Sequence, residues 1–173
     1  MLDKNDKAVR FSIFRHKDAP DDGIQIMESE PLSEVAMAGA QKVMAAGIEQ
    51  GHENRVLFSG GGFSLVYAWF KSGYPLPRHT HNTDCLYYII GGSLSIGSEE
   101  LTEGDGFFVG KDVPYTYKVG ENGLEILEFR ASELFNIKVL ANNAGFWDKA
   151  VATVNANKDQ WLGETKPSKP PSA

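Results

Sequence analysis

The stretch that decides the fold is residues 73–92, Gly73-Tyr-Pro-Leu-Pro-Arg-His79-Thr-His81-Asn-Thr-Asp-Cys85-Leu-Tyr-Tyr-Ile-Ile-Gly-Gly92. It contains two of the four histidines of the chain, spaced two residues apart. Alternate residues of a β-strand point to the same face, so His79 and His81 would present both imidazoles to one side of a sheet. Imidazole is the commonest neutral metal ligand among side chains, so the pair is a candidate chelating site.

On both sides of the histidine pair, the sequence reads as short strands separated by glycine-containing turns. Predicted strands span residues 55–59, 63–70, 85–90, 93–96, 107–109, 114–119 and 124–130. The predicted turns are residues 60–62, 91–92, 104–106 and 120–123. Short strands with turn residues at this spacing are typical of an antiparallel sandwich or barrel.

The N-terminal part of the chain predicts strands and one helix. Residues 9–14 alternate apolar and polar, and residues 24–27 form a second short strand candidate. A helix is predicted over residues 33–50, with Ser33 as its N-cap and Gly51 as its stop. Its buried stripe, at helical spacing, is predicted to consist of Met37, Ala40, Met44 and Ile48.

The C-terminal part predicts an apolar segment, a helix and a tail. Residues 135–140 are apolar, and residues 144–156 read as an amphipathic helix that buries Phe146, Trp147, Ala150 and Val154. The proline-containing end of the chain predicts a disordered tail or a lightly tethered arm. The expected organisation is an N-terminal strand and helix extension packing on the barrel (1–54), the barrel (55–131), a C-terminal extension with a helix (132–162) and a tail (163–173).

Composition narrows the classes of partner and compartment. The chain has 173 residues, a formal net charge of -6 and no cluster of Lys and Arg, which argues against nucleic acid or a membrane as partner. No apolar run approaches the roughly 20 residues that span a bilayer, and residues 1–7 lack the apolar core of a signal peptide. The single cysteine allows no internal disulfide, which fits a cytoplasmic location.

The spacing of residues 73–92 resembles the first signature of the cupin superfamily: Gly, five residues, His-x-His, three or four residues, Glu, six residues, Gly. Four of its positions are in register, and the Glu is replaced: Gly73, His79, His81 and Gly92 match, and Cys85 stands for the Glu. Residues 104–119 resemble the second cupin signature in spacing. There Gly104 matches, and Gly110, Asp112, Tyr115 and Val119 replace its Pro, Gly, His and Asn.

The resemblance covers about residues 55–131. It implies a mostly β fold, an antiparallel barrel or jelly roll, to which this chain adds its N-terminal strand and helix and its C-terminal helix. It also implies a pocket inside the barrel for a metal or a small-molecule ligand. Cupins are commonly dimers, so one of the two helices, together with an outer sheet face carrying Leu86, Tyr88 and Ile90, is expected to cover the barrel or to form a homodimer contact.

The resemblance further implies a divalent metal, Fe, Zn, Ni or Mn, held by three histidines and one carboxylate. This chain supplies His79 and His81, and Tyr115 stands where the third His would be. Strand alternation places Cys85 and Tyr87 on the same inward face.

Three interpretations of the site stay open. In the first, the metal binds the histidine pair with Tyr115 or a carboxylate as third ligand; Asp84 lies next to the right place but points away unless a bulge re-aims it. In the second, Cys85 binds the metal as a thiolate. In the third, no metal binds tightly, and histidines and tyrosines, including Tyr87, recognise an organic ligand.

Two hypotheses of function follow. The first is a small metal-dependent cupin enzyme, a candidate oxidoreductase or lyase, that acts on an oxygenated small organic molecule as a dioxygenase, lyase or isomerase. Its candidate catalytic residues are Tyr115, as a ligand or proton donor, and Tyr87. The alternative is a non-catalytic cupin that binds or senses a small ligand. A metal-free enzyme that uses a His-Tyr pair as base and acid is a third option.

Overall fold

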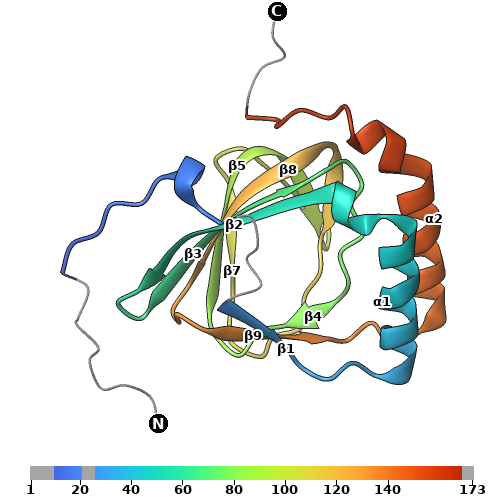
Figure 1. Ribbon diagram of the computed structural model, residues 1–173, viewed down its shortest axis with the longest axis horizontal. Coiled ribbons are helices and arrows are strands. Elements are labelled where there is room, and N and C mark those ends of the chain that lie inside the picture. The colour runs from blue at the N-terminus through green and yellow to red at the C-terminus, as the bar shows by residue number, and fades with distance from the viewer. Residues whose placement is uncertain (1–9, 21–25, 169–173) are drawn as a thin grey trace, which may run out of the picture.

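The structure is a computed structural model that describes residues 10–20 and 26–168 (Figure 1). Its strands are β1 (Met27–Ser29), β2 (His52–Gly60), β3 (Phe63–Phe70), β4 (His79–Thr80), β5 (Cys85–Ile96), β6 (Glu99–Thr102), β7 (Gly106–Val109), β8 (Lys118–Arg130) and β9 (Phe135–Val139). Its helices are α1 (Glu34–Ala46), α2 (Ala144–Trp161) and the short 3-10 turns η1 (His16–Asp18) and η3 (Ile48–Gly51).

The strands form two sheets that enclose one core. The larger sheet has the order β2-β3-β8-β5-β6, with β7 also paired to β5, and the smaller sheet has the order β1-β9-β4. All pairings except β1 with β9 are antiparallel. Inward-facing residues of β5 and β8 fill the core between the sheets, as strand alternation predicts. The predicted β-barrel architecture is therefore confirmed.

Two predicted turns are wrong, because the chain continues through them as strand. Residues 91–92 lie inside β5 and residues 120–123 lie inside β8. The β5–β8 register shifts between Ile89 and Gly91 and again between Gly92 and Leu94, so the glycines accommodate β-bulges instead of a hairpin. Gly92 has a φ of 77°, and an added Cβ there would lie 2.1 Å from the carbonyl oxygen of Gly123. Local sequence signals a break at such glycines without distinguishing a bulge from a turn.

One motif position that lacks its glycine nevertheless keeps a glycine-like backbone. Asp112 stands where the second cupin signature has a Gly, and its φ is 61°. It is the one non-glycine residue with positive φ in the described part of the chain. The loop turns in the left-handed region at this position, which Asp tolerates better than most residues other than glycine.

Helix α1 begins as predicted, but it ends earlier and its buried face is shifted by one residue, so that of the predicted stripe Ala40 and Ile48 are partly buried and the two methionines are exposed. The Ser33 hydroxyl accepts a hydrogen bond from the Ala36 amide, which confirms the predicted N-cap. The helix ends at Gly47, which is left-handed with a φ of 101°, and not at Gly51. Its buried residues are Ala36, Gly39 and Val43, whereas Met37 and Met44, which were predicted to be buried, are 50% and 67% exposed.

Helix α2 explains that offset, because it packs side by side with α1 on one side of the barrel (Figure 1). The Trp147 indole lies where a Cβ of Gly39 would be, 2.1 Å from its Cγ. Only a glycine allows this approach, and it fixes which face of α1 is covered. The predicted stripe through Met37 and Met44 therefore lies one residue away from the face of α1 that α2 covers, which contains Ala36 and Val43.

We expect Gly39→Ala to lower the free energy of unfolding by about 1–3 kcal/mol, since overpacking a dense contact costs that much. The higher helix propensity of Ala offsets only a fraction of the loss. Chemical denaturation at pH 7 measures the change. Gly145→Ala on α2 is the matched control, because its added Cβ meets only the Asn143 side-chain oxygen, at 3.4 Å. Equal stability of the two variants would contradict the packing argument.

The C-terminal segment is longer and more ordered than the sequence predicted. Helix α2 runs to Trp161, beyond the predicted end at residue 156, and the Trp161 indole is fully buried and donates to the Ser72 carbonyl at 2.9 Å. Trp147, Ala150 and Val154 are buried as predicted, and Phe146 is partly buried. After the helix, the Ser168 amide donates to Glu125 at 2.7 Å, so this part of the predicted disordered tail or lightly tethered arm is tethered to the barrel. Residues 169–173 lie outside the described part.

The N-terminal strand predicted over residues 9–14 is wrong where the structure describes it. Residues 10–15 have no regular secondary structure, and Phe11 is 84% exposed. Alternation alone does not make a strand when no neighbouring strand pairs with it. The second predicted strand overlaps β1 at Met27, while residues 24 and 25 lie outside the described part.

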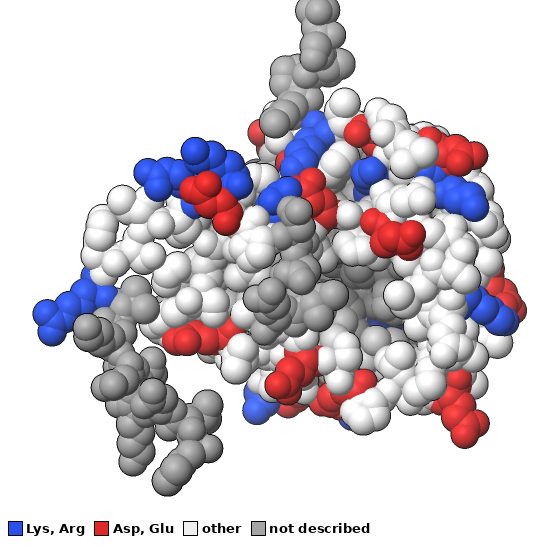
Figure 2. Space-filling model, viewed as in Figure 1, with Lys and Arg blue, Asp and Glu red and all other residues white. Residues whose placement is uncertain are grey.

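The surface carries no large charged patch on the face seen in Figure 2, where acidic and basic side chains are interspersed. Within residues 10–20 and 26–168, neither helix has the length and apolar character needed to cross a bilayer.

Candidate small-molecule site

A cavity of about 330 Å³ lies between the two sheets, near the lower end of the range for small-molecule pockets. Its apolar and aromatic walls are formed by Met27, Val66, Phe70, Tyr74, Leu76, Phe135 and Ile137. Its polar lining consists of His52, Asn54, His79, His81, Tyr115, Tyr117, Glu128 and Arg130. A mostly apolar cavity with a few convergent polar groups is the usual form of a ligand site.

The two motif histidines line this cavity with fixed orientations. Both are buried, and their ring centroids lie 5.0 Å apart. Nδ1 of His79 lies 2.8 Å from the Pro77 carbonyl oxygen, and Nδ1 of His81 lies 2.6 Å from that of Asn136. A carbonyl only accepts, so each Nδ1 carries a proton and each Nε2 carries a lone pair. The pair therefore offers hydrogen-bond acceptors to a ligand.

The charges of both rings follow from their surroundings. Burial lowers the pKa of both histidines, so both are neutral at pH 7. The pKa of His81 falls to about 3, since the Arg130 cation adds to the effect of burial. For His79, the Pro77 carbonyl and the Glu128 carboxylate oppose the effect of burial on the pKa. His79 is consequently the better placed of the two to accept a proton.

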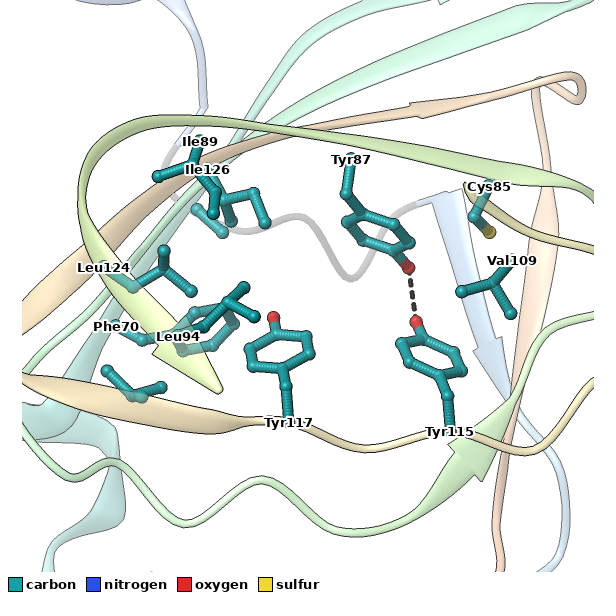
Figure 3. Packing of buried hydrophobic residues seen from close by; sticks show 12 residues of the cluster. Phe70, Cys85, Tyr87, Ile89, Leu94, Val109, Tyr115, Tyr117, Leu124 and Ile126 are labelled. Carbon is teal, nitrogen blue, oxygen red and sulfur yellow. Dashed lines mark hydrogen bonds between the residues drawn. The ribbon is translucent and has the colours of Figure 1, made fainter. Parts of the chain in front are cut away.

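Tyr115 lines this wall, and Tyr87, which was also predicted to face the pocket, lies behind it in the core and does not line the cavity. The hydroxyls of Tyr87 and Tyr115 hydrogen bond to each other (Figure 3). The Tyr115 ring centroid is 4.5 Å from that of His79, and the two backbones form a bridge. Burial raises the pKa of both phenols well above the ordinary value. Both remain protonated at neutral pH, which makes Tyr115 a proton or hydrogen-bond donor.

The other two predicted ligands do not line the cavity. Cys85 is buried in the core, as Figure 3 shows, and its thiol donates to the Thr83 carbonyl at 3.5 Å. Burial raises the pKa of the Cys85 thiol, which favours the protonated form. Asp84 is exposed, and its carboxylate accepts from the Lys111 amide at 2.8 Å, away from the pocket, as strand alternation predicts.

These donors do not fit the metal site that the cupin resemblance implies. The histidine pair by itself fits, because metal-bound histidines typically donate the second ring nitrogen to a carbonyl. A third donor is lacking: no group of three His, Cys, Asp or Glu in the described part is arranged to hold a metal. Tyr115 is a protonated phenol bonded to Tyr87, and the Arg130 cation that depresses the pKa of His81 would also repel a metal cation.

The most informative pocket residue was not predicted from the sequence. Arg130 is 2% exposed, donates through Nη2 to Glu128 at 2.6 Å, and lies 4.0 Å from the Phe135 ring centroid. Its Nε and Nη1 make no hydrogen bond of good geometry in the described part of the chain, where the Cys85 thiol is a weak neighbouring acceptor of the guanidinium. Buried guanidinium donors are normally satisfied, so a cation with spare donors at a cavity wall indicates a site for an oxygen acceptor.

Strand alternation over residues 124–130 does indicate that Arg130 faces the interior of the barrel. Leu124 and Ile126 were part of a predicted strand and point into the core, so alternation places Glu128 and Arg130 on the same inward face. Local sequence does not point to two further polar lining residues, His52 and Asn54, because Gly51-His-Glu-Asn predicts a loop, whereas His52 begins β2.

Comparisons with solved structures identify the fold. The polyketide cyclase RemF from Streptomyces resistomycificus is similar with a TM-score of 0.56 and 13% identity, over 84% of this chain and 96% of that chain. A protein of unknown function with a cupin-like fold from Ralstonia eutropha JMP134 gives a TM-score of 0.50 and 15% identity, over 87% of this chain and 89% of that one. An RmlC-like cupin from Shewanella frigidimarina gives 23% identity and a TM-score of 0.43, over 49% of this chain and 78% of that one.

The chain therefore has the cupin fold, as the resemblance of residues 73–92 predicts. No family model matches this sequence, and no curated protein does. These similarities concern the fold alone, so the chemistry of this protein is inferred from the residues that line its cavity.

Proposed function

We propose that this cupin is an enzyme that transfers protons on a small, partly apolar hydroxy-carbonyl compound. The observation that carries the proposal is the pairing, in one cavity, of two neutral imidazole acceptors with the buried and incompletely bonded Arg130. A hydroxyl donates to imidazole and a carbonyl accepts from guanidinium, so a molecule with both groups satisfies both sets.

In this mechanism His79 is the base. Its Nε2 takes the proton from the carbon next to the substrate carbonyl, and the electron pair of that C–H bond moves onto the carbonyl oxygen as an enolate. Arg130 donates to this oxygen, where negative charge develops, which is the interaction that lowers the barrier most in such reactions. The Glu128 carboxylate supports the imidazolium that forms on His79.

Two further residues position and protonate the substrate. His81, with its lower pKa, is the poorer base, so its Nε2 accepts from the substrate hydroxyl. Tyr115 lies against His79 and donates its phenolic proton or a hydrogen bond to the enolate, with Tyr87 holding its hydroxyl in place. Return of the proton from His79 to the former carbonyl carbon, while the substrate hydroxyl gives its proton to the Tyr115 oxygen and becomes the new carbonyl, completes an isomerisation. Departure of a β-substituent with the electron pair of the enolate, and with the proton held by His79, gives a lyase.

Hydrogen–deuterium exchange tests the proposal without knowledge of the natural substrate. Aryl hydroxymethyl ketones with phenyl, naphthyl or biphenyl groups carry the required carbonyl and hydroxyl beside an apolar body. In deuterated buffer the enzyme is expected to accelerate exchange of the hydrogens between these groups, measured by proton NMR. His79→Gln is expected to reduce the enzyme-dependent rate at least 100-fold, as expected for loss of a general base.

Tyr115→Phe is the matched variant, because it removes only the phenolic oxygen and leaves the ring beside His79. It is expected to reduce the exchange rate less than His79→Gln, since the base and Arg130 remain. Binding of the ketones without accelerated exchange would overturn the proposal and favour the non-catalytic ligand-binding alternative.

A divalent metal on the histidine pair is a second candidate, favoured by the two Nδ1 contacts to carbonyls. With only two nitrogen donors and a nearby guanidinium, we expect weak and exchangeable binding. Protein made without a polyhistidine tag, loaded with Zn²⁺ or Fe²⁺ and then desalted, is expected to retain well under one equivalent by elemental analysis. One retained equivalent that disappears in His79→Ala/His81→Ala would instead establish a resident metal.

We further propose that the protein is a homodimer through the outer face of its larger sheet. An apolar band crosses this face, because Leu86 pairs with Phe129 on one side and with Phe108 on the other, and Phe129 stacks on Phe63. These four side chains and Tyr88 are between 38% and 63% exposed. A continuous apolar band on a soluble protein is typical of an interface, and a second copy covers it symmetrically.

Light scattering at micromolar concentration is expected to give twice the chain mass. Leu86→Glu would place two like charges in the interface and is expected to give a monomer. Met44→Glu is the control, since Met44 is equally apolar and 67% exposed on α1, away from the band. A monomeric mass for the unmodified protein would refute this assembly.

A further inference from the structure

A second polar pair lines the same cavity from a different sheet. His52 and Asn54 are two residues apart on β2, in the larger sheet, whereas His79 lies on β4 of the smaller sheet. The His52 ring packs edge-on against Tyr74, 5.4 Å between centroids. Neither side chain has a role in the mechanism proposed above.

Both side chains contain buried polar atoms without partners. His52 Nδ1 and Asn54 Oδ1 have no hydrogen-bond partner in the described part of the chain. Of the other side chains with unpartnered buried atoms, Arg130 lines the cavity and already has a role in the mechanism, whereas Ser64 and Trp69 do not line it. Buried polar groups are nearly always hydrogen-bonded, so two neighbouring exceptions on a cavity wall indicate that a ligand completes them.

The chemistry of these atoms defines the ligand group. The unpartnered atom of Asn54 is its amide oxygen Oδ1, which accepts and needs a donor. Nδ1 of the neutral His52 ring has no partner either, and in the tautomer that protonates this nitrogen it donates and needs an acceptor. A hydroxyl is the small group that can accept from Nδ1–H of His52 and donate to Oδ1 of Asn54 at once.

We infer that His52 and Asn54 form a second subsite that binds a hydroxyl group on the apolar body of the substrate, remote from its reacting carbonyl. The inference rests on the proposed function, because both subsites belong to one cavity and one ligand. It narrows the substrate class to molecules with a hydroxy-carbonyl end, an apolar or aromatic middle and a further alcohol or phenol.

Matched ligand pairs test the subsite. The probes are the phenyl, naphthyl and biphenyl hydroxymethyl ketones, each with and without one hydroxyl at the far end of the ring system, so that three lengths are sampled. Calorimetry is expected to show about a tenfold gain in affinity from the distal hydroxyl for at least one length, which is the worth of one good hydrogen bond. Asn54→Leu and His52→Phe are each expected to abolish this gain while the affinity for the parent ketone changes little.

Ser64→Ala is the control, because it removes a buried unpartnered hydroxyl that does not line the cavity. The gain is expected to survive in this variant. Parent ketones that bind without any gain from the hydroxyl, or a gain that persists in Asn54→Leu, would overturn the subsite and leave the proposed function standing. If no parent ketone binds, the proposed function fails and the subsite falls with it.

The ligand-free protein gives a second readout. Since Asn54→Leu replaces an unsatisfied buried amide with an apolar group of similar size, the melting temperature is expected to rise by about 2–4 °C. A fall in melting temperature would mean that the amide serves the fold, and would count against the subsite.

Discussion

Arg130→Met is expected to lower the free energy of unfolding by about 3–5 kcal/mol, the typical cost of removing one partner of a buried ion pair. The Arg130 side chain is 3% exposed and that of Glu128 is 12% exposed, and their contact is 2.6 Å. Without the guanidinium, the Glu128 carboxylate stays in the cavity wall with no opposite charge beside it. Methionine fills a similar volume, so the loss arises from charge and not from a void.

The double variant Arg130→Met/Glu128→Gln separates charge from packing. It leaves no buried charge, so most of the lost stability is expected to return. Urea denaturation at pH 7 measures both variants, and accelerated exchange on the hydroxymethyl ketones is expected to disappear in the double variant because the enolate loses its donor. A single variant as stable as the unmodified protein would show that Glu128 is solvated or protonated, and that the pair is not the buried ionic element inferred here.

The bounds of individual strands and the faces of their side chains were predicted correctly where they depend only on neighbouring residues in the sequence. Strand β3 has the predicted bounds, residues 63–70, since alternation and flanking glycines suffice to define it. Along β5 the alternation of Cys85, Leu86 and Tyr87 gave the correct inward and outward faces, because side chains of a strand alternate whatever its partners are.

The errors arose where a distant partner decides the outcome. The buried face of α1 depends on where Trp147 docks on Gly39, and a helix with apolar side chains on several faces does not reveal this. Similarly, residues 91–92 are bulged instead of turned because the long strand β8 pairs with β5 on both sides of them.

The candidate site was predicted in part, for a related reason. The spacing of residues 73–92 identified His79 and His81, and the register of the second signature pointed to Tyr115. Arg130 lies outside both signatures, and its importance depends on Glu128 and on its unpartnered donors, which are properties of the folded pocket.

A drop in pH from 7 to 5 is expected to destabilise the protein, with His81 contributing about 2 kcal/mol of the loss. The pKa of His81 is about 3 in the folded protein and about 6.5 in an unfolded chain. Between these two values the unfolded chain binds the proton and the folded protein does not, so stability rises with pH. The penalty is therefore absent above about pH 7 and grows as pH falls below the unfolded pKa of about 6.5.

His81→Gln isolates this contribution, because glutamine keeps a hydrogen-bonding side chain without a proton to gain. Between pH 7 and pH 5, the unmodified protein is expected to lose about 2 kcal/mol more of its free energy of unfolding than this variant loses. Urea denaturation at each pH measures both losses. Equally steep loss of stability in acid for His81→Gln and the unmodified protein would mean that the His81 imidazole is already protonated in the folded state. A protonated imidazole would donate a hydrogen bond to the ligand, whereas the proposed mechanism requires it to accept one.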